Sequence, residues 1–490
     1  MLPEYPLPSL DLLSSPGSSA CVDDEQLCKN LELIVETLRH FKVEASPGEI
    51  TPTATVTRYE VYPAPRVRVE RISRLGRDLA RVLRVERVDV LAPLPGKSSV
   101  GIDVPNPNKS PIVLRELLES KNWRTTNAMI PVALGKDFYG KALVADLTAM
   151  PHLLLGGTTG SGKSVCLNCV LLSLLFKFSP DELRLILIDP MRVEMQVYNG
   201  LPHLIAPVVT DPKKVAFAFR WIGSEIERRY SLFAENGVLD IASFNSRNRR
   251  SEDREWIEGE PVTPDKLPYI VIIVDEFTDL MQLAPQEVEV KVARLATKAR
   301  AAGVHLVIST QTPRREIVTS LIKNNIPARI AFQVPSSLDS RVILDDNGAE
   351  TLFGKGDFLY RSARGDSLVR GQGAYVSDEE VHAVVRFVRS QVSGASAAVQ
   401  NVSKDANEIG KEDQELIIEC WKVIRSEKRA STSNLQRRLR LGYNRAAYVI
   451  DYLEKAGVLG PGDGAKPREI LVSLDSEELF FANVENHPPF

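Results

Sequence analysis

The sequence has few cysteines and no long apolar run, and each absence excludes a class of protein. Five cysteines scattered over 490 residues do not make the disulfide framework of a small secreted protein. No stretch of about 18 consecutive apolar residues occurs, so the sequence predicts no membrane-spanning helix and no direct insertion into a membrane. The start, MLPEYPLPSLDLLSSPG, has neither the basic nor the apolar region of a secretory signal. We therefore expect a reducing, cytoplasmic environment.

The sequence also lacks an excess of charge of one sign. Its 61 basic and 64 acidic side chains leave a formal net charge of −3, which excludes a uniformly basic coat for nucleic acid. Any contact with nucleic acid would have to come from a local basic patch or from loops that line a pore.

One C-x-x-C pair is present, formed by Cys166 and Cys169. Such a pair can bind zinc or perform redox chemistry, but no second pair supplies the remaining zinc ligands. The pair follows a glycine-rich loop on a stretch with the pattern of a buried helix. We favour the interpretation that both cysteines are small apolar core residues.

Composition and periodicity divide the chain into segments. Apolar residues between Leu27 and Phe41 recur at three- and four-residue steps, which is typical of an amphipathic helix. A stretch near residue 400 lacks aromatic residues and large apolar clusters, as linkers do. We expect a flexible start (1–24), a small α/β subdomain (25–130), a larger α/β core (131–390), a linker (391–411), a C-terminal module (412–475) and a tail (476–490).

The small subdomain alternates short β-rich segments with one helical segment. The segments TVTRYEVYP, RVRVERI, VDVLAP and SVGIDVP are expected to be strands, and SRLGRDLARVL a helix.

The larger core alternates helical patterns with short, continuous apolar runs. The predicted strands are HLLLG (152–156), LRLILID (183–189), YIVIIVD (269–275), VHLVIST (304–310) and ARIAFQV (328–334). Continuous apolar runs indicate strands buried on both faces, so the sequence predicts an α/β fold with helices on both sides of a parallel sheet. The charged stretch from Arg247 to Lys266 is expected to be an exposed loop.

A phosphate-binding loop follows the first of these strands. The motif G-x-x-x-x-G-K-[ST] is formed by Gly157, Thr158, Thr159, Gly160, Ser161, Gly162, Lys163 and Ser164. Glycines let backbone N–H groups approach phosphates, and the N-terminus of the following helix favours their negative charge. Lys163 is expected to contact the β- and γ-phosphates of ATP, and Ser164 to bind Mg²⁺.

Acidic residues end two of the predicted strands. Asp275 and Glu276 follow four β-branched residues, so we expect Asp275 to hold Mg²⁺ and Glu276 to act as the general base on the attacking water. Carboxylates at the C-terminal ends of parallel strands lie where such sheets bind ligands. A solvated strand end is the alternative for this pair. Asp189, after the second strand, fits a structural role as well as a catalytic one.

Three further residues are candidates for sensing or stabilising the γ-phosphate. Gln311 ends the strand next in sequence after the acidic pair and is a candidate sensor. An ATPase that forms a ring needs an arginine from the neighbouring subunit, and we expect Arg300, or else Arg341, in that role. For both arginines an ordinary surface position is the alternative.

The C-terminal module has the pattern of a winged helix. Three helical segments precede a glycine-rich hairpin, and six basic residues lie between Lys428 and Arg445 with no carboxylate among them. Such a patch suits DNA phosphates, and the start of the third helix would reach base edges. The candidate DNA-binding residues are Arg437, Arg438, Arg440, Asn444, Arg445 and Tyr448. A module that binds protein is the alternative.

With these residues in place, the chain closely resembles the FtsK/SpoIIIE DNA translocases. The resemblance runs from about residue 7 to residue 472 and includes TVTRYEV, MPHLLLGGTTGSGKSV, LILIDP, YIVIIVDEFTDLM, KARAAGVHLVISTQ, GAETLFGKGD and LGYNRAA. It implies an α subdomain, a RecA-like P-loop core and a winged-helix γ domain. It further implies a homohexamer around double-stranded DNA that hydrolyses ATP in chromosome segregation and cell division. In some members the γ domain also activates a tyrosine recombinase.

The sequence departs from the family pattern at several positions. Met191 stands where lysine is common, and Gln311-Thr312-Pro313 lacks an arginine that usually follows the glutamine. Tyr448 replaces an arginine of the recognition helix, which is expected to alter or relax the sequence preference. The family's membrane-spanning N-terminal region is missing, as in a soluble member or a truncated chain.

Two other functions fit parts of the pattern. A secretion or conjugation ATPase shares this kind of core, but the basic helix-turn-helix favours a protein that acts on duplex DNA. A DNA-binding regulator without motor activity would not need Lys163, Ser164, Asp275 and Glu276.

Overall fold

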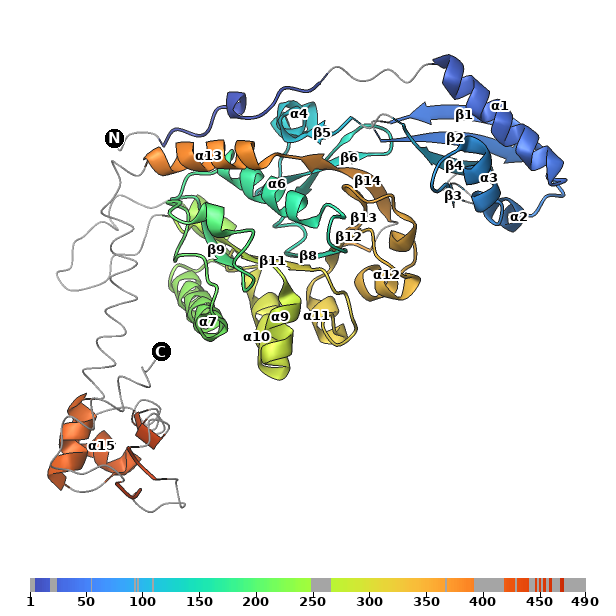
Figure 1. The fold of residues 1–490 in the computed structure, drawn as a ribbon. Coiled ribbons are helices and arrows are strands. Elements are labelled where there is room, and N and C mark those ends of the chain that lie inside the picture. Colours follow the sequence, from blue (N-terminus) through green and yellow to red (C-terminus); the bar gives the residue numbers. More distant parts are fainter. Residues whose placement is uncertain are drawn as a thin grey trace. The chain divides into compact units, whose positions relative to one another are not determined.

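The computed structural model describes most of the chain (Figure 1). The described residues are 5–17, 24–53, 55–91, 94, 97–107, 110–247, 266–365, 368–391, 418–427, 430–439, 446, 449–450, 453–454, 458–460 and 468–470. The chain forms two compact units, Met1–Ser393 and Gly394–Phe490. None of the helices in the described part has the length and apolarity needed to cross a lipid bilayer.

The first unit begins with a small antiparallel sheet covered by helices. Its strands are β1 (Ala45–Pro52), β2 (Val56–Pro63), β3 (Asp89–Leu91) and β4 (Val100–Pro105), in the order β1-β2-β4-β3. Helix α1 (Asp24–His40) buries the apolar face that its sequence predicted. The other segment predicted to be helical forms α3 (Gly76–Leu83). We refer to residues 24–107 as the N-terminal subdomain.

Two predictions for this subdomain were wrong. RVRVERI was expected to be a strand, but Val69–Ser73 form helix α2. Only one side chain of this helix, Ile72, is buried, and a single helical turn is enough to bury it. The strand β1 was missed. It contains Pro47, Gly48 and Pro52, yet it pairs with β2 at the edge of the sheet, where a missing N–H is tolerated, and its register shifts after Pro47.

The main sheet runs in the order β7-β6-β14-β13-β12-β8-β11-β10-β9. The predicted parallel strands are confirmed as β8 (His152–Gly156), β9 (Leu183–Ile188), β10 (Tyr269–Val274), β11 (Val304–Thr310) and β12 (Ala328–Phe332). Antiparallel strands extend the sheet, and β5 pairs with β14. These strands are β5 (Ile112–Val113), β6 (Pro131–Asp137), β7 (Ala142–Asp146), β13 (Asp357–Arg361) and β14 (Val369–Tyr375).

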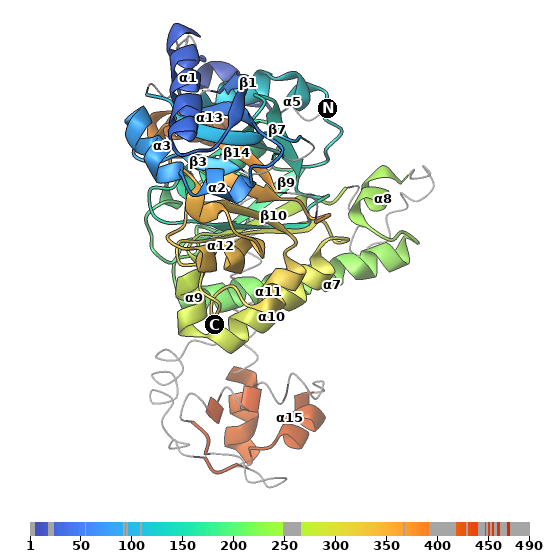
Figure 2. The same cartoon turned by 90° about the vertical axis from the view of Figure 1, so that its right-hand side faces the viewer.

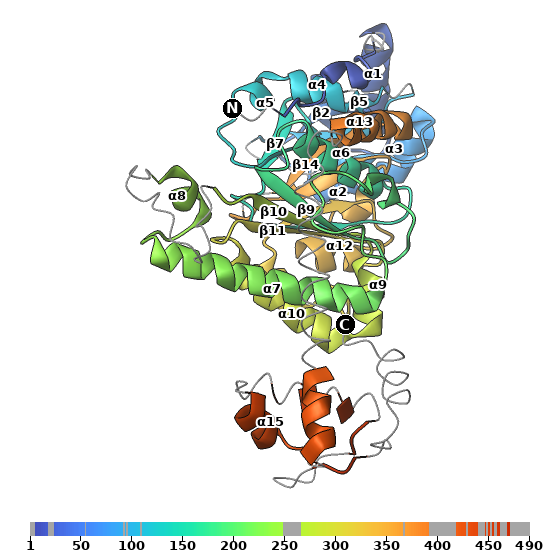
Figure 3. The same ribbon diagram turned by 90° about the vertical axis from the view of Figure 1, so that its left-hand side faces the viewer.

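Helices cover both faces of this sheet (Figures 1 to 3). One face packs on α6 (Lys163–Leu175) and α13 (Asp378–Ser390). The other packs on α7 (Pro212–Glu235), α9 (Phe277–Leu283), α10 (Pro285–Ala299), α11 (Ser320–Asn325) and α12 (Ser337–Leu344), and Figures 2 and 3 show α7 and α10 side by side. Along β10, Val271 and Ile273 enter one layer of the core while Ile270 and Ile272 enter the other, which explains the continuous apolar run. Smaller helices are α4 (Leu114–Glu119), α5 (Lys121–Arg124) and α8 (Ile241–Ser246).

The C-x-x-C pair belongs to this core. Cys166 and Cys169 are buried on α6 within the apolar layer above the sheet, and both are free thiols. Their interpretation as core residues is confirmed. Most of the predicted loop from Arg247 to Lys266 lies outside the described residues.

The second unit is a winged-helix domain, of which parts are described. Residues 418–427 are helical, α15 spans Thr432–Leu439, and antiparallel bridges join Ala430 to Arg468 and Leu459 to Ile470. Its core contains Cys420, Trp421, Ile424, Leu435, Val449, Ile450 and Leu453.

Candidate functional site

The phosphate loop joins β8 to α6, as its motif requires. Gly160 and Gly162 have φ angles of 77° and 113°, a region that glycine adopts without strain. A Cβ atom on Gly162 would lie 2.6 Å from the backbone nitrogen of Gly356. The same nitrogen donates a hydrogen bond to the Ser161 carbonyl at 2.7 Å. The loop is therefore held from outside by residues 355–356, which follow α12 in the chain.

Lys163 is buried against the end of the neighbouring strands. Its Nζ lies 3.0 Å from Asp275 Oδ1 and 2.8 Å from Ser309 Oγ, and Ser309 donates to the same carboxylate oxygen at 2.7 Å. The side chains of Lys163 and Asp275 are 2% and 4% exposed. Because β11 lies between β8 and β10, its residue Ser309 is placed to bridge the lysine and the aspartate. Ser309 was not singled out from the sequence.

Ser164 has a partner that the sequence analysis missed. Its hydroxyl donates to Glu194 Oε1 at 2.6 Å. Burial raises the pKa of Glu194, and the nearby Asp275 adds to this rise. Asp189 accepts the backbone N–H groups of Arg192 and Met195, at 2.9 and 3.1 Å, and so shapes the turn that carries Glu194. The signal available in the sequence was a second carboxylate shortly after a core strand.

Glu276 and Gln311 lie together at the mouth of the loop. The Gln311 backbone N–H donates to Glu276 Oε2 at 3.1 Å, and the Thr159 hydroxyl donates to Gln311 Oε1 at 2.7 Å. Glu276 is buried, with a φ of 51°, in the left-handed region that non-glycine residues rarely adopt. Such an outlier is common where a side chain is aimed for a function.

A cavity of about 470 Å³ opens beside the loop. It is lined by phosphate-loop residues, Glu194 and Gln311, by β14 and the segment before β5, and by Thr55 of the N-terminal subdomain. The lining residues outside the motif include Thr55, Pro111, Ile112, Lys355, Gln372 and Tyr375. Apolar and aromatic side chains next to polar phosphate-binding groups suit a nucleotide.

The oxygen donors at the loop fit a magnesium ion. Ser164 supplies a hydroxyl that contacts the Glu194 carboxylate, and the neighbouring Lys163 contacts a second carboxylate, Asp275. Within the described residues no group of three His, Cys, Asp or Glu side chains could hold a metal by itself. Mg²⁺ bound with a nucleotide normally takes one or two protein carboxylates and completes its shell with phosphates and water, so this donor set is sufficient.

The two candidate arginine fingers lie on the surface. Arg300 is exposed at the end of α10, just before β11 begins, whereas the phosphate loop follows the C-terminal end of β8. Because β8 and β11 are parallel, Arg300 and the phosphate loop lie at opposite ends of these strands. Arg341 is exposed on α12. Action on a neighbouring subunit stays a prediction for both.

The DNA-binding candidates are described only in part. Arg437 and Arg438 are exposed on α15, and Arg438 forms an ion pair with Glu427. Arg440, Asn444, Arg445 and Tyr448 lie outside the described residues.

A strand, a glycine loop, a helix and an acidic residue on a nearby strand define the class of P-loop nucleotide-binding proteins. Comparison with family models gives the particular family. The model described as "FtsK/SpoIIIE family" matches residues 113–315, "FtsK alpha domain" matches 7–106, and "Ftsk gamma domain" matches 411–473. The chain belongs to the FtsK/SpoIIIE family.

Individual relatives match along almost the whole chain. "DNA translocase FtsK" of Caldanaerobacter subterraneus subsp. tengcongensis is 46% identical over 97% of this chain and 65% of its own length. "DNA translocase SpoIIIE" of Bacillus subtilis is 44% identical over 96% and 60%. Among solved structures, the pCW3 conjugation coupling protein TcpA is 21% identical over 73% of this chain and 99% of its own, with a TM-score of 0.49. The chain thus spans less than two thirds of the length of these translocases.

Proposed function

We propose that this protein is an ATP-driven motor that moves along double-stranded DNA. The observation that carries the proposal is the arrangement at the phosphate loop. Lys163, Ser164 with its partner Glu194, and Gln311 line one cavity of about 470 Å³. Behind them, Lys163 contacts the buried Asp275, and the Gln311 backbone N–H donates to the strained Glu276. The names of the translocases to which the chain is similar add support for DNA as the partner.

The residues have separate tasks in this proposal. Lys163 binds the β- and γ-phosphates of ATP once it releases Asp275, and loop N–H groups hold the phosphates. Ser164, with Asp275 and Glu194, holds Mg²⁺, which neutralises phosphate charge. Glu276 orients and deprotonates the attacking water, because its carboxylate lies at the loop mouth and Gln311 fixes its position. Ile112 and Tyr375, which also line the cavity, accommodate the base and ribose.

We propose a homohexamer around the duplex, with Arg300 or Arg341 completing the site of a neighbouring subunit. The winged-helix domain orients the motor through the basic residues Arg437 and Arg438 and the four candidates outside the described residues. A motor of this kind serves chromosome segregation and cell division in the cytoplasm, with a tyrosine recombinase as a further partner.

ATP hydrolysis with different polymers tests this proposal. Steady-state phosphate release is measured alone, with linear duplex DNA, and with single-stranded DNA of equal nucleotide concentration. We expect duplex DNA to increase the rate at least tenfold and single strands to have little effect. Stimulation by single strands alone would instead favour a conjugation ATPase. Hydrolysis that no DNA changes would favour a secretion ATPase.

A further inference from the structure

Strand β14 connects the cavity with the N-terminal subdomain. Its residues Gln372, Gly373, Ala374 and Tyr375 line the cavity. Arg370 and Gln372, two residues apart and so on one face, also contact the subdomain. Arg370 is 11% exposed and forms ion pairs with Asp89 at 2.8 Å and Asp103 at 3.0 Å. It also binds Asp357, the residue after Gly356, at 2.8 Å. This cluster anchors β14 to the subdomain.

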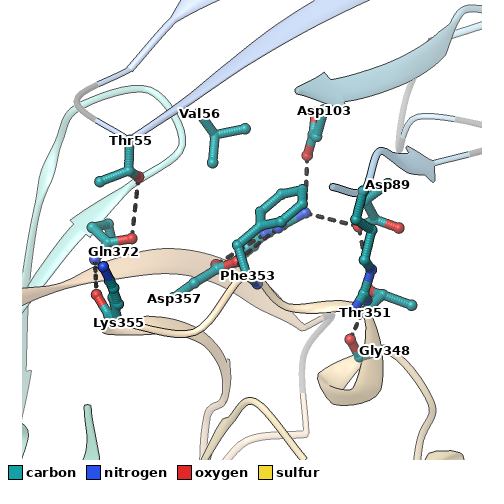
Figure 4. A network of polar contacts seen from close by, with 12 residues as sticks. Thr55, Val56, Asp89, Asp103, Gly348, Thr351, Phe353, Lys355, Asp357 and Gln372 are labelled. Atoms are coloured by element: carbon teal, nitrogen blue, oxygen red, sulfur yellow. Dashed lines mark hydrogen bonds and ion pairs between the residues drawn. The ribbon is translucent and has the colours of Figure 1, made fainter. Parts of the chain in front are cut away.

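Gln372 makes the contact that leads to the phosphate loop (Figure 4). Its amide oxygen accepts a hydrogen bond from the Thr55 hydroxyl at 3.1 Å, and its amide nitrogen donates to the Lys355 carbonyl at 2.7 Å. The next residue of that turn, Gly356, donates its N–H to Ser161 of the loop at 2.7 Å and accepts the N–H of Gly373 at 2.7 Å. Hydrogen bonds therefore run without interruption from Thr55 through Gln372 and the 355–356 turn to Ser161.

The turn has little freedom to move independently of the loop. A Cβ on Gly162 would meet the Gly356 nitrogen at 2.6 Å, and a Cβ on Gly356 would meet Gln372 Nε2 at 2.9 Å. Close backbone contact on one side and the glutamine amide on the other confine residue 356. A displacement of Gln372 is consequently transmitted to the phosphate loop, since packed groups respond together.

We propose that Gln372 is a positioning residue, through which the N-terminal subdomain holds the phosphate loop ready for a nucleotide. Thr55 fixes the orientation of the glutamine amide, and the amide fixes the turn that holds Ser161. The effect on nucleotide affinity rests on the proposed function, whereas the ordering of the loop does not.

Amide hydrogen exchange in the nucleotide-free protein tests the ordering directly. We compare Thr55→Val, which removes the hydroxyl at nearly constant volume, with Thr55→Ser, which keeps it. A peptide covering residues 157–164 is expected to exchange several-fold faster in the valine variant and as in the parent protein in the serine variant. Unchanged exchange of this peptide in T55V would overturn the proposal. So would an equal increase throughout residues 131–390, which would show general destabilisation.

A double-mutant cycle on nucleotide affinity tests the route. The Kd of a fluorescent ATP analogue is measured for T55V, Q372A and the double variant. Each single variant is expected to bind about three- to tenfold more weakly, the usual effect of one lost hydrogen bond. The double variant is expected to bind no more weakly than Q372A, because Thr55 acts through Gln372. Additive losses would mean that both side chains contact the nucleotide separately and would overturn the proposal. If the parent protein binds no nucleotide while T55V still loosens the loop, the proposed function fails and the positioning role stands.

Discussion

Lys163 and Asp275 form a buried ion pair, with 3.0 Å between Nζ and Oδ1, at the place where phosphates and Mg²⁺ are expected to bind. A buried ion pair gains little net stability, because desolvation offsets most of the attraction, but removing one partner leaves an uncompensated charge. A bound nucleotide supplies alternative partners for both groups. The pair therefore keeps the two charges satisfied until ATP and Mg²⁺ arrive.

Replacing Lys163 by alanine should affect both stability and activity. We expect Lys163→Ala to lower the free energy of unfolding by about 3 kcal/mol, because Asp275 stays buried without its cation. ATP hydrolysis should fall to background. Lys298→Ala is a matched control, since Lys298 forms a surface pair with Glu227 in which the side chains are 49% and 62% exposed. Urea unfolding and phosphate release measure the two effects, and normal turnover in K163A would refute the role of the loop.

Glu276→Gln should separate binding from hydrolysis. The amide keeps the shape of the side chain but does not accept a proton, so hydrolysis should fall about 10²- to 10⁴-fold while ATP still binds. Asp279→Asn is the control, three residues further along the chain in the first turn of α9. Retained hydrolysis in E276Q would remove Glu276 as the base. Single-turnover hydrolysis and equilibrium binding of ATP distinguish the two steps.

Glu194→Gln should weaken the magnesium site. Its carboxylate accepts the Ser164 hydroxyl at 2.6 Å, and loss of such a supporting group commonly lowers metal affinity about 10- to 100-fold. The measurement is the Mg²⁺ concentration for half-maximal binding of a fluorescent nucleotide, with binding in EDTA as the baseline. Glu182→Gln is the control, because the Glu182 carboxylate, just before β9, likewise accepts a serine hydroxyl, that of Ser179, at 2.8 Å. An unchanged Mg²⁺ requirement would exclude Glu194 from the site.

Acid should destabilise the first unit through its buried histidines. Burial lowers the pKa of His152, His203 and His305 from 6.5 to about 4. The unfolded chain binds these protons more readily, so the stabilisation is complete above pH 6.5 and is lost as the pH falls towards 4. Between pH 6.5 and pH 4 and below, each histidine lowers the free energy of unfolding by about 3 kcal/mol in total.

Urea unfolding between pH 7.5 and pH 4 measures this loss. His305→Phe should make the loss of stability between pH 7.5 and pH 4 smaller by about 3 kcal/mol, whereas His382→Gln, at an exposed position, should leave it as it is. A free energy of unfolding that stays constant over this range would be incompatible with neutral buried histidines.

Arg437→Ala should weaken binding to duplex DNA without changing its sequence preference. An exposed arginine on α15 suits a phosphate contact, so its loss should reduce the slope of log affinity against log salt by about one. Lys422→Ala removes a charge of the same sign from the helical stretch 418–427 and should have a smaller effect. Fluorescence anisotropy at several salt concentrations measures the slope. Equal slopes for R437A and the parent protein would exclude Arg437 from the interface.

Burial decided which parts of the fold could be predicted. The runs that became β8 to β12 were predicted because both faces of these strands are covered, as Ile272 and Ile273 show by entering opposite layers of the core. In the N-terminal subdomain this signal is weaker. Because only Ile72 of α2 is buried, the pattern of this short helix was interpreted as a strand. The edge strand β1 was not predicted, because it contains prolines.

Within the site, the residues of the motif were predicted and their neighbours from other segments were not. The motif predicted the phosphate loop with Lys163 and Ser164, because the spacing of its glycines is a local requirement of the chain. Ser309, Glu194 and Gln372 come from three other segments and become neighbours only through the strand order and a turn. No spacing rule in the sequence connects them with the loop.

Movement along DNA is the most direct test of the central claim. A third strand annealed to a linear duplex is displaced when a motor runs through it, and its release can be followed by fluorescence. The account predicts displacement that requires ATP and Mg²⁺ and is abolished by K163A. A chain that binds ATP and duplex DNA yet never displaces the third strand would contradict it.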